Sequence, residues 1–214
     1  MNREIQSLVC FALKEEAGAF RKLAADRADV YILITGIGRK NAGSNVGAFL
    51  KSCRPRFILT CGFAGALNPQ LAIGDVVFAT DDDSLRETLN RAGARPATLF
   101  CASRIAVTAA EKTELRRTTG ADAVEMESEA IQTVCREQGI PCATVRVISD
   151  SANEDLPLDF NQLSKSDSSL HFGKLALAIA KSPGKISGLL RLQKNCRLAA
   201  ERLAGVLAKV IEPR

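Results

Sequence analysis

Short apolar segments alternate with segments of helical periodicity along most of this chain, and this alternation constrains the fold more than any other feature. Runs rich in β-branched residues indicate strands, and apolar side chains repeating every three to four positions indicate helices. Alternation of this kind is typical of a β-sheet with helices on its faces. We therefore predict a three-layer α/β fold with a mixed central sheet flanked by helices. A chain of 214 residues fits one such domain, spanning 1–214.

The expected elements follow from the same pattern. Strands are predicted at 7–13, 30–35, 57–61, 74–80, 97–107, 123–125 and 142–148, and helices at 15–25, 40–51, 111–119, 128–138 and 186–211. Two glycine-rich segments, 36–38 and 62–65, are predicted as turns after strands. The polar stretch 81–95 is expected to be a surface helix or loop outside the core. Residues 150–170 are rich in Ser, Asp, Asn and Pro, which predicts a long loop, and such loops in compact domains are commonly functional.

Charge and cysteine content exclude several classes of protein. The net charge of +5 is too small to indicate a nucleic-acid binder. The seven cysteines are odd in number and mostly lie in apolar segments, which is typical of free thiols in a reducing compartment. Because His171 is the only histidine and no Cys-x-x-Cys pair occurs, we expect no metal site. With no secretion signal and no apolar run long enough to span a bilayer, we expect a cytoplasmic protein.

The end of the chain, 186–212, is expected to form an amphipathic helical region, because Leu and Val recur there close to helical spacing. The favoured interpretation is a helix that docks on the sheet. The alternative is a helix in peripheral contact with a membrane, whose cations meet anionic headgroups. The cations concerned are Lys181, Lys185, Arg191, Lys194, Arg197 and Arg202.

Glu125 and Glu127 flank Met126 where an expected strand passes into an expected helix. In a continuing strand the two carboxylates would share one side and Met126 would lie on the other, whereas an early helix start would turn Glu127 into a pocket. The plainer alternative places both glutamates in the first helical turn, where negative charge interacts favourably with the helix dipole. Spacing alone favours this alternative.

Arg146 lies within an apolar, β-branched strand that ends in Ser149 and Asp150. A buried arginine needs an acidic partner, because leaving a buried charge unpaired costs about 3 to 5 kcal/mol, and the nearby glutamates are candidates. Asp150 stands at the carboxyl end of a strand, where α/β sheets place their ligand crevice. A helix or turn cap explains Asp150 equally well from the residues alone.

Taken together, these motifs resemble the nucleoside phosphorylase and nucleosidase superfamily over about residues 7–160. Each is weak alone, but their order and spacing together are specific. The most similar branch is the methylthioadenosine/S-adenosylhomocysteine nucleosidases, whereas the end of the chain resembles the hopanoid-associated phosphorylases. The motifs are Phe11-Ala-Leu-Lys-Glu-Glu16, Thr35-Gly-Ile-Gly-Arg-Lys-Asn-Ala42, Gly62-Phe-Ala-Gly-Ala-Leu67 with Ile73-Gly-Asp-Val76, Ala123-Val-Glu-Met-Glu-Ser128 and Val145-Arg-Val-Ile-Ser-Asp150.

The resemblance implies an enzyme without a cofactor that cleaves the N-glycosidic bond of a purine nucleoside, through a transition state in which the ribose is cation-like. By this resemblance Asp150 protonates or hydrogen-bonds the purine N7, a contribution of roughly 100- to 10,000-fold. Glu127 grips the ribose hydroxyls, Glu16 activates water, and Arg146 helps to hold that water and Glu127. The substrate-contacting positions that it implies are Met126, Glu125, Ser149, Phe160, Ile37, Phe63, Ala64 and Gly65.

Hydrolysis is favoured over phosphorolysis because the chain lacks a Gly-Asp-Pro-type phosphate loop, although Arg39 and Arg104 leave a phosphate-dependent reaction open. Phe63 stands where the methylthioadenosine enzymes carry a serine, and the insertion around 81–100 is short, so the expected substrate is a 5′-modified adenosine whose 5′ group differs or is more exposed. The alternatives are a lipid nucleoside that releases adenine and a non-catalytic nucleoside sensor. The expected partners are a purine nucleoside, water or phosphate, and a second copy in a homodimer.

Overall fold

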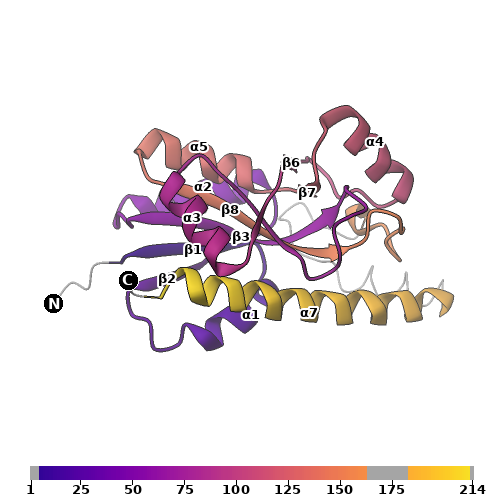
Figure 1. Cartoon of the computed structure of the whole chain (residues 1–214), viewed down its shortest axis with the longest axis horizontal. Helices are drawn as coiled ribbons and strands as arrows, with labels where there is room; N and C mark the ends of the chain where they lie inside the picture. Colours follow the sequence, from indigo (N-terminus) through magenta and orange to yellow (C-terminus); the bar gives the residue numbers. More distant parts are fainter. Residues whose placement is uncertain (1–4, 163–182, 213–214) are drawn as a thin grey trace.

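The computed structural model of the protein describes residues 5–162 and 183–212 (Figure 1). His171 and Lys181 therefore lie outside the described residues. The strands are β1 (Ser7–Phe11), β2 (Val30–Ile34), β3 (Phe57–Ala66), β4 (Val76–Thr80), β5 (Arg95–Pro96), β6 (Leu99–Cys101), β7 (Ala123–Glu125) and β8 (Cys142–Asp150). The helices are α1 (Lys14–Leu23), α2 (Arg39–Leu50), α3 (Asp83–Ala92), α4 (Ala109–Thr119), α5 (Ser128–Gln138) and α7 (Ile186–Val210), with the short 3₁₀ helices η1 (Phe160–Gln162) and η2 (Pro183–Lys185).

The described strands form one mixed sheet whose main path is β2-β1-β3-β8-β4-β5. β1 pairs in parallel with β2 and β3, and β3 pairs in parallel with β8. β4 runs antiparallel to β8, and β7 pairs antiparallel with the end of β3. The parallel pairing brings the carboxyl ends of β1, β3 and β8 to one edge, with Gly62 opposite Arg146 and Gly65 opposite Asp150. The sheet thus gathers several of the sequence motifs at this edge.

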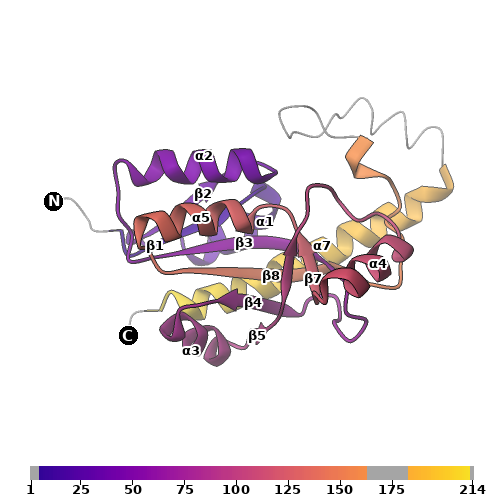
Figure 2. The same cartoon turned by 90° about the horizontal axis from the view of Figure 1, so that it is seen from above.

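Helices cover both faces of the sheet (Figure 2), which confirms the predicted three-layer α/β fold. On one face α2 and α5 pack against β1 and β3, through buried side chains such as Val46 and Ile131. On the other face α1, α3 and α7 bury a larger cluster that includes Phe20, Leu89 and Leu203. Each core strand is buried on both sides, which is why the strands are continuous apolar runs.

Three segments differ from the expectation. Of the strand predicted at 97–107, only β6 (Leu99–Cys101) forms. Residues 62–65 do not form a turn: β3 continues to Ala66 because its backbone keeps pairing with β8 through this glycine-rich stretch. The polar stretch after β4 forms α3, and this helix contributes to the core because Leu85, Leu89 and Ala92 share one face and are buried. Spacing of three to four residues, and not average polarity, decides burial in such a helix.

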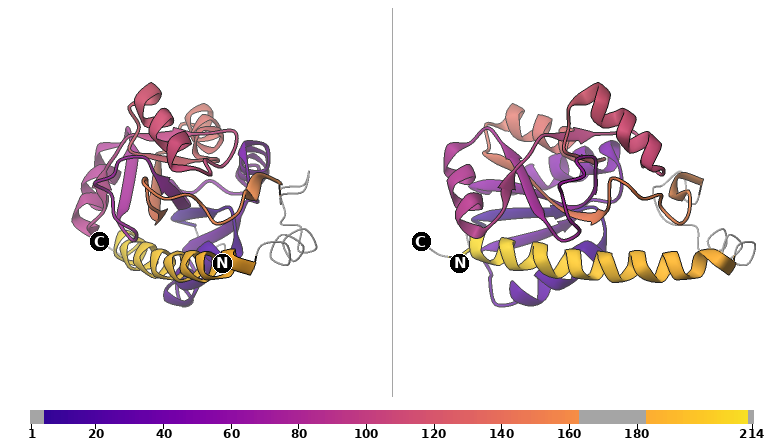
Figure 3. Two further views of the ribbon diagram at one scale, coloured as in Figure 1. Left: turned by 90° about the vertical axis from the view of Figure 1, so that its right-hand side faces the viewer. Right: turned by 45° about the vertical axis from the view of Figure 1, so that its right-hand side comes forward.

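Helix α7 docks on the sheet through its second half, as the favoured interpretation predicted. Ala199, Leu203 and Leu207 are fully buried there. The first half extends past the edge where β3 and β8 end (Figure 3), and it leaves Leu190 60% exposed. Among the described residues, no helix combines the length and apolar character needed to cross a membrane.

Candidate active site

Arg146 is the centre of a buried charge cluster at the edge where β3 and β8 end. Its side chain is 1% exposed, and its Nη2 lies 2.5 Å from Glu125 Oε2 and 3.7 Å from Glu127 Oε2. Burial alone would lower the pKa of Arg146, but the carboxylates of Glu125, Glu127 and Glu16 hold it above its ordinary value. The guanidinium therefore stays charged, and the acidic partners expected for it are present.

Glu125 binds Arg146 and caps the start of α5. Besides Arg146, its carboxylate accepts hydrogen bonds from the backbone N of Glu127 at 3.0 Å, the backbone N of Ser128 at 2.9 Å and Ser128 Oγ at 2.6 Å. Burial raises the pKa of Glu125, but Arg146 and these donors outweigh it and hold the pKa below the ordinary value. The carboxylate binds Arg146 and caps α5, and three of its four donors are on Oε2.

Glu127 is the N-cap residue of α5, two residues beyond the end of β7, so the two glutamates do not share a helical turn. Its Oε1 accepts a hydrogen bond of 2.9 Å from the backbone N of Gly38, at the start of α2. Burial raises the pKa of Glu127, and Arg146 and the Gly38 N–H oppose this rise. Glu127 thus links the β2–α2 turn to the charge cluster.

Glu16 reaches the same cluster from α1, and its environment is typical of a general base. The side chain is buried, with Oε1 accepting from the backbone N of Phe63 and Oε2 from the backbone N of Leu13, both at 2.9 Å. Burial raises the pKa of Glu16 to about 7, although both hydrogen bonds and Arg146 oppose the rise. A carboxyl group with a pKa near neutrality is suited to accepting a proton from water.

Gly62 allows Glu16 and Arg146 to approach each other. A Cβ added to Gly62 would lie 2.6 Å from Arg146 Nη1 and 2.7 Å from Glu16 Oε1, closer than real Cβ contacts come. Glycine is therefore needed at this position because a larger residue would collide with these two side chains, and not because the backbone turns here.

Replacing Gly62 by Ala is expected to displace these two side chains and to lower kcat/KM at least about 100-fold, because a shift of about 1 Å in a catalytic group has an effect of this size. Gly47→Ala is the matched control, since a Cβ on Gly47 in α2 meets nothing within 4 Å. Steady-state kinetics of both variants would check this, and equal activities would contradict the steric argument.

Asp150 lies at the end of β8 and is held from two sides. Ser149 Oγ donates to its Oδ1 at 2.8 Å, and Lys112 Nζ donates to its Oδ2 at 2.6 Å. A Cβ on Gly65 would lie 3.0 Å from Oδ2, so this glycine leaves space for the carboxylate. Lys112 was not among the site residues predicted from the sequence. A signal was present, because Lys112 precedes Leu115 by three residues and so shares the apolar face of α4.

The pKa of the Cys196 thiol on α7 is affected by both Asp150 and the charge cluster. Burial raises the pKa of this thiol to about 11, and the negative charges of Asp150 and Glu16 contribute in the same direction. Both carboxyl groups therefore act on one thiol of the helix that crosses the sheet edge. Contacts along the ends of β3 and β8 connect the four expected catalytic residues: Gly62 adjoins Glu16 and Arg146, Arg146 pairs with Glu127, and Gly65 adjoins Asp150.

The remaining positions expected to contact substrate lie on four segments. Ile37 precedes α2 and Met126 precedes α5, and both are half-buried. Phe63, Ala64 and Gly65 lie on β3 beside β8, with the carbonyl of Ala64 3.4 Å from Ser149 Oγ. Phe160 begins η1, at the far end of the loop that follows Asp150, and is half-buried.

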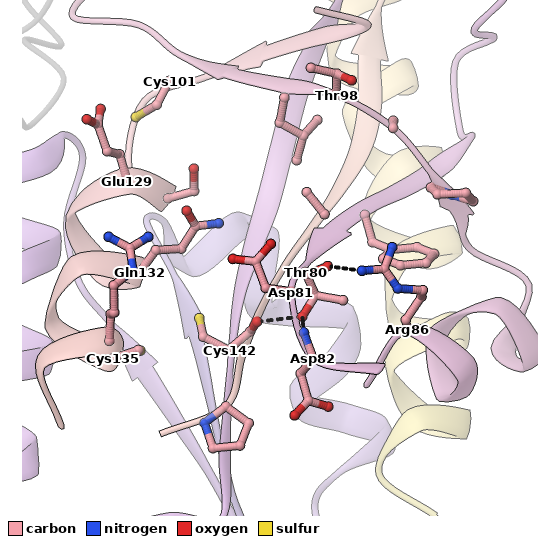
Figure 4. A pocket seen from close by; sticks show the side chains of 18 of the residues that line it. Thr80, Asp81, Asp82, Arg86, Thr98, Cys101, Glu129, Gln132, Cys135 and Cys142 are labelled. Carbon is pink, nitrogen blue, oxygen red and sulfur yellow. Dashed lines mark hydrogen bonds between the residues drawn. The ribbon is translucent and has the colours of Figure 1, made fainter. Parts of the chain in front are cut away.

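A groove of about 1380 Å³ lies elsewhere, between β4, β6 and α5 (Figure 4). Its charged groups have ordinary surface functions: Glu129 pairs with Arg39 at 2.8 Å, and Asp82 caps α3. Unlike the cluster around Arg146, the groove combines no buried carboxyl group with a neighbouring buried cation, so we place the candidate active site at the cluster. In the part of the chain that the structure describes, no group of three His, Cys, Asp or Glu side chains is arranged to hold a metal ion.

Comparison of the sequence with known proteins identifies its family. A profile of the phosphorylase superfamily matches residues 14–102 and 94–182. The chain is 27% identical over 195 residues to the 5′-methylthioadenosine/S-adenosylhomocysteine nucleosidase of Geobacillus kaustophilus, covering 75% of this chain and 83% of that protein. The corresponding enzyme of Shewanella halifaxensis is 25% identical over 169 residues, covering 63% and 74%.

Two solved structures share the fold. The futalosine hydrolase of Helicobacter pylori superposes with a TM-score of 0.72 at 16% identity, covering 97% of each chain. The 5′-methylthioadenosine/S-adenosylhomocysteine nucleosidase of Neisseria meningitidis, in complex with methylthio-immucillin-A, gives 0.72 at 20% identity, covering 97% of this chain and 98% of that one. The profile match covers most of the sequence, and the chain belongs to the phosphorylase superfamily.

Proposed function

We propose that this protein hydrolyses the N-glycosidic bond of a purine nucleoside, an adenosine derivative modified at its 5′ position. The observation that carries the proposal is the buried Glu16, which has a pKa of about 7 and lies beside the cation of Arg146. A sensor that only binds a nucleoside has no use for such a base, whereas hydrolysis requires one. The curated relatives are nucleosidases, which supports the same class of reaction.

The proposed reaction divides the chemistry between two carboxyl groups. Glu16 takes a proton from water as the water oxygen attacks the anomeric carbon. The bond from that carbon to the base breaks and its electron pair goes to the base. Asp150, protonated in the reacting complex, transfers its proton to N7 and is left as the carboxylate that Lys112 Nζ and Ser149 Oγ bind. Glu127 holds the ribose hydroxyls, and the negative charge of the cluster stabilises the cation-like sugar. The products are the free base and the 5′-modified ribose.

Water is favoured over phosphate as the nucleophile because both arginines that could bind phosphate are engaged. Arg39 pairs with Glu129 at 2.8 Å, and Arg104 pairs with Glu111 at 2.6 Å. Each guanidinium already has a carboxylate partner, which weakens its attraction for a further anion. These ion pairs are a second reason to favour hydrolysis, in addition to the missing phosphate loop.

We expect base release to proceed at full rate in phosphate-free buffer. The measurement is liberated purine from a panel of nucleosides, each with and without phosphate. The panel contains 5′-methylthioadenosine, S-adenosylhomocysteine, futalosine, inosine, guanosine and an adenosine with a long 5′-alkyl chain. Strict dependence on phosphate would move the protein to the phosphorylases.

The alkylated adenosine tests the lipid-nucleoside alternative, which the exposed first half of α7 favours. Ile186 and Leu190 are 43% and 60% exposed on this part of the helix, which contacts the loop after β8 through the ion pair of Arg191 with Glu154 at 3.0 Å. Preference for the alkylated compound over the other five would support that alternative. The homodimer stays a prediction of the resemblance, which light scattering would test.

A further inference from the structure

Lys112 is a fully buried cation that the proposed reaction does not yet use. Its side chain is 0% exposed, although lysine is almost never buried unless it is paired. Nζ donates to Asp150 Oδ2 at 2.6 Å, to the carbonyl of Ser151 at 2.7 Å and to the carbonyl of Glu154 at 3.1 Å. The three N–H donors of an ammonium group thus meet three acceptors, so this charge is completely satisfied.

These contacts fix both the carboxylate of Asp150 and the chain that follows it. With Lys112 on Oδ2 and Ser149 on Oδ1, rotation of the carboxylate would break at least one charge-assisted hydrogen bond. The Ser151 and Glu154 carbonyls are drawn to the same Nζ, so the backbone leaving β8 curls around it. Lys112 therefore determines where the end of β8 presents its acid.

Further contacts tie the same loop to the segment that carries Lys112. The carboxylate of Asp155 accepts from the backbone N of Ala109 at 2.8 Å, at the first residue of α4. Asn161 Oδ1 accepts from the backbone N of Ile105 at 2.9 Å. The loop is thus held against the start of α4 and the segment before it, but of these contacts from the α4 segment only that of Lys112 reaches Asp150 itself. This distinction separates a positioning function from simple attachment of the loop.

We infer that Lys112 is a positioning residue for base release: its ammonium group holds Asp150 in the orientation from which the acid meets the purine, and it affects the reaction only through Asp150. The inference rests on the proposed function, which makes Asp150 the acid. It also explains why α4 places a lysine on its apolar face, where a leucine would pack at no cost in desolvation.

The test is a double-mutant cycle between Lys112→Met and Asp150→Asn, measured as kcat and KM for adenine release. K112M alone is expected to lower kcat at least tenfold and to change KM less than threefold. In the D150N background, K112M is expected to change kcat less than twofold, because there is no acid left to position. Arg116→Met is the control: Arg116 is on the same helix, and its ion pair with Asp122 lies away from the site.

A merely structural function of Lys112 predicts the opposite pattern. K112M would then slow D150N by the same factor as the wild type, and this result, or an unchanged kcat in K112M, would overturn the inference. If circular dichroism shows that K112M does not fold, Lys112→Gln, whose amide still donates hydrogen bonds, replaces it in the cycle.

Failure of the proposed function has a different signature, namely a wild type that releases no base from any nucleoside. The same four proteins would then be titrated calorimetrically with adenine. Weaker adenine binding on mutation of Lys112 in the wild type, but not in D150N, supports the positioning function, and equal weakening in both backgrounds contradicts it.

Discussion

Replacing Asp150 by Asn is expected to lower kcat for base release roughly 100- to 10,000-fold while the protein remains folded. The amide has almost the same shape, and its oxygen can still accept the hydrogen bond from Lys112 Nζ, but it has no proton to give to N7. The measurement is liberated purine under saturating substrate. Turnover equal to that of the wild type would remove Asp150 from the mechanism.

The same substitution is expected to cost stability, because the buried Lys112 loses its charged partner. The loss should be on the order of 1 to 3 kcal/mol, since a hydrogen bond remains. Asp155→Asn is the matched control, because Asp155 is in the same loop and its carboxylate caps α4 at the backbone N of Ala109. We expect this control to retain activity within about threefold, as it contacts none of the proposed catalytic residues.

Replacing Glu16 by Gln is expected to remove the base and so to lower kcat/KM at least about 100-fold. In the wild type, kcat/KM should fall about tenfold per pH unit below about pH 7, because only the ionised form of Glu16 accepts a proton and its pKa is about 7. The residual activity of E16Q should lack this dependence. A wild-type profile that stays flat down to about pH 5 would exclude Glu16 as the base.

Glu16→Gln also has a predicted effect on stability, of opposite sign to its effect on activity. The folded protein retains the Glu16 proton up to about pH 7, whereas the unfolded chain releases it near 4.5. The stabilisation from this proton is therefore complete below 4.5 and is lost as the pH rises toward 7. Relative to the wild type, the free energy of unfolding of E16Q should rise between about pH 5 and about pH 8, by on the order of 3 kcal/mol at most. Urea unfolding at the two pH values measures this change.

The layers of the fold could be predicted from the sequence because each rests on a local pattern. Continuous apolar runs identify strands buried on both faces, and β8 is the clearest of these. Where prediction failed, pairing between distant segments decided the outcome. β3 runs through its glycines because β8 supplies hydrogen-bond partners, and α3 is buried because α7 and β4 cover one of its faces. Neither partner is visible in the local sequence.

In the candidate site, too, local features could be predicted and contacts between distant segments could not. An acidic partner of Arg146 could be expected, because a cation in an apolar strand requires one. Spacing did not reveal that Glu125 would be the nearest glutamate, with its Oε2 2.5 Å from Arg146 Nη2. Lys112 was missed because its partner is 38 residues away and its helix has only a narrow apolar face. Gly62 was assigned to a turn because its steric function appears only once Glu16 from α1 lies against it.

A crystal structure of D150N with 5′-methylthioadenosine would test the account most directly. The account predicts that the purine N7 lies within hydrogen-bond distance of residue 150, that the ribose hydroxyls contact Glu127, and that Glu16 faces the anomeric carbon. A nucleoside seated instead in the groove between β4, β6 and α5, with Glu16 and Glu127 out of its reach, would contradict the account.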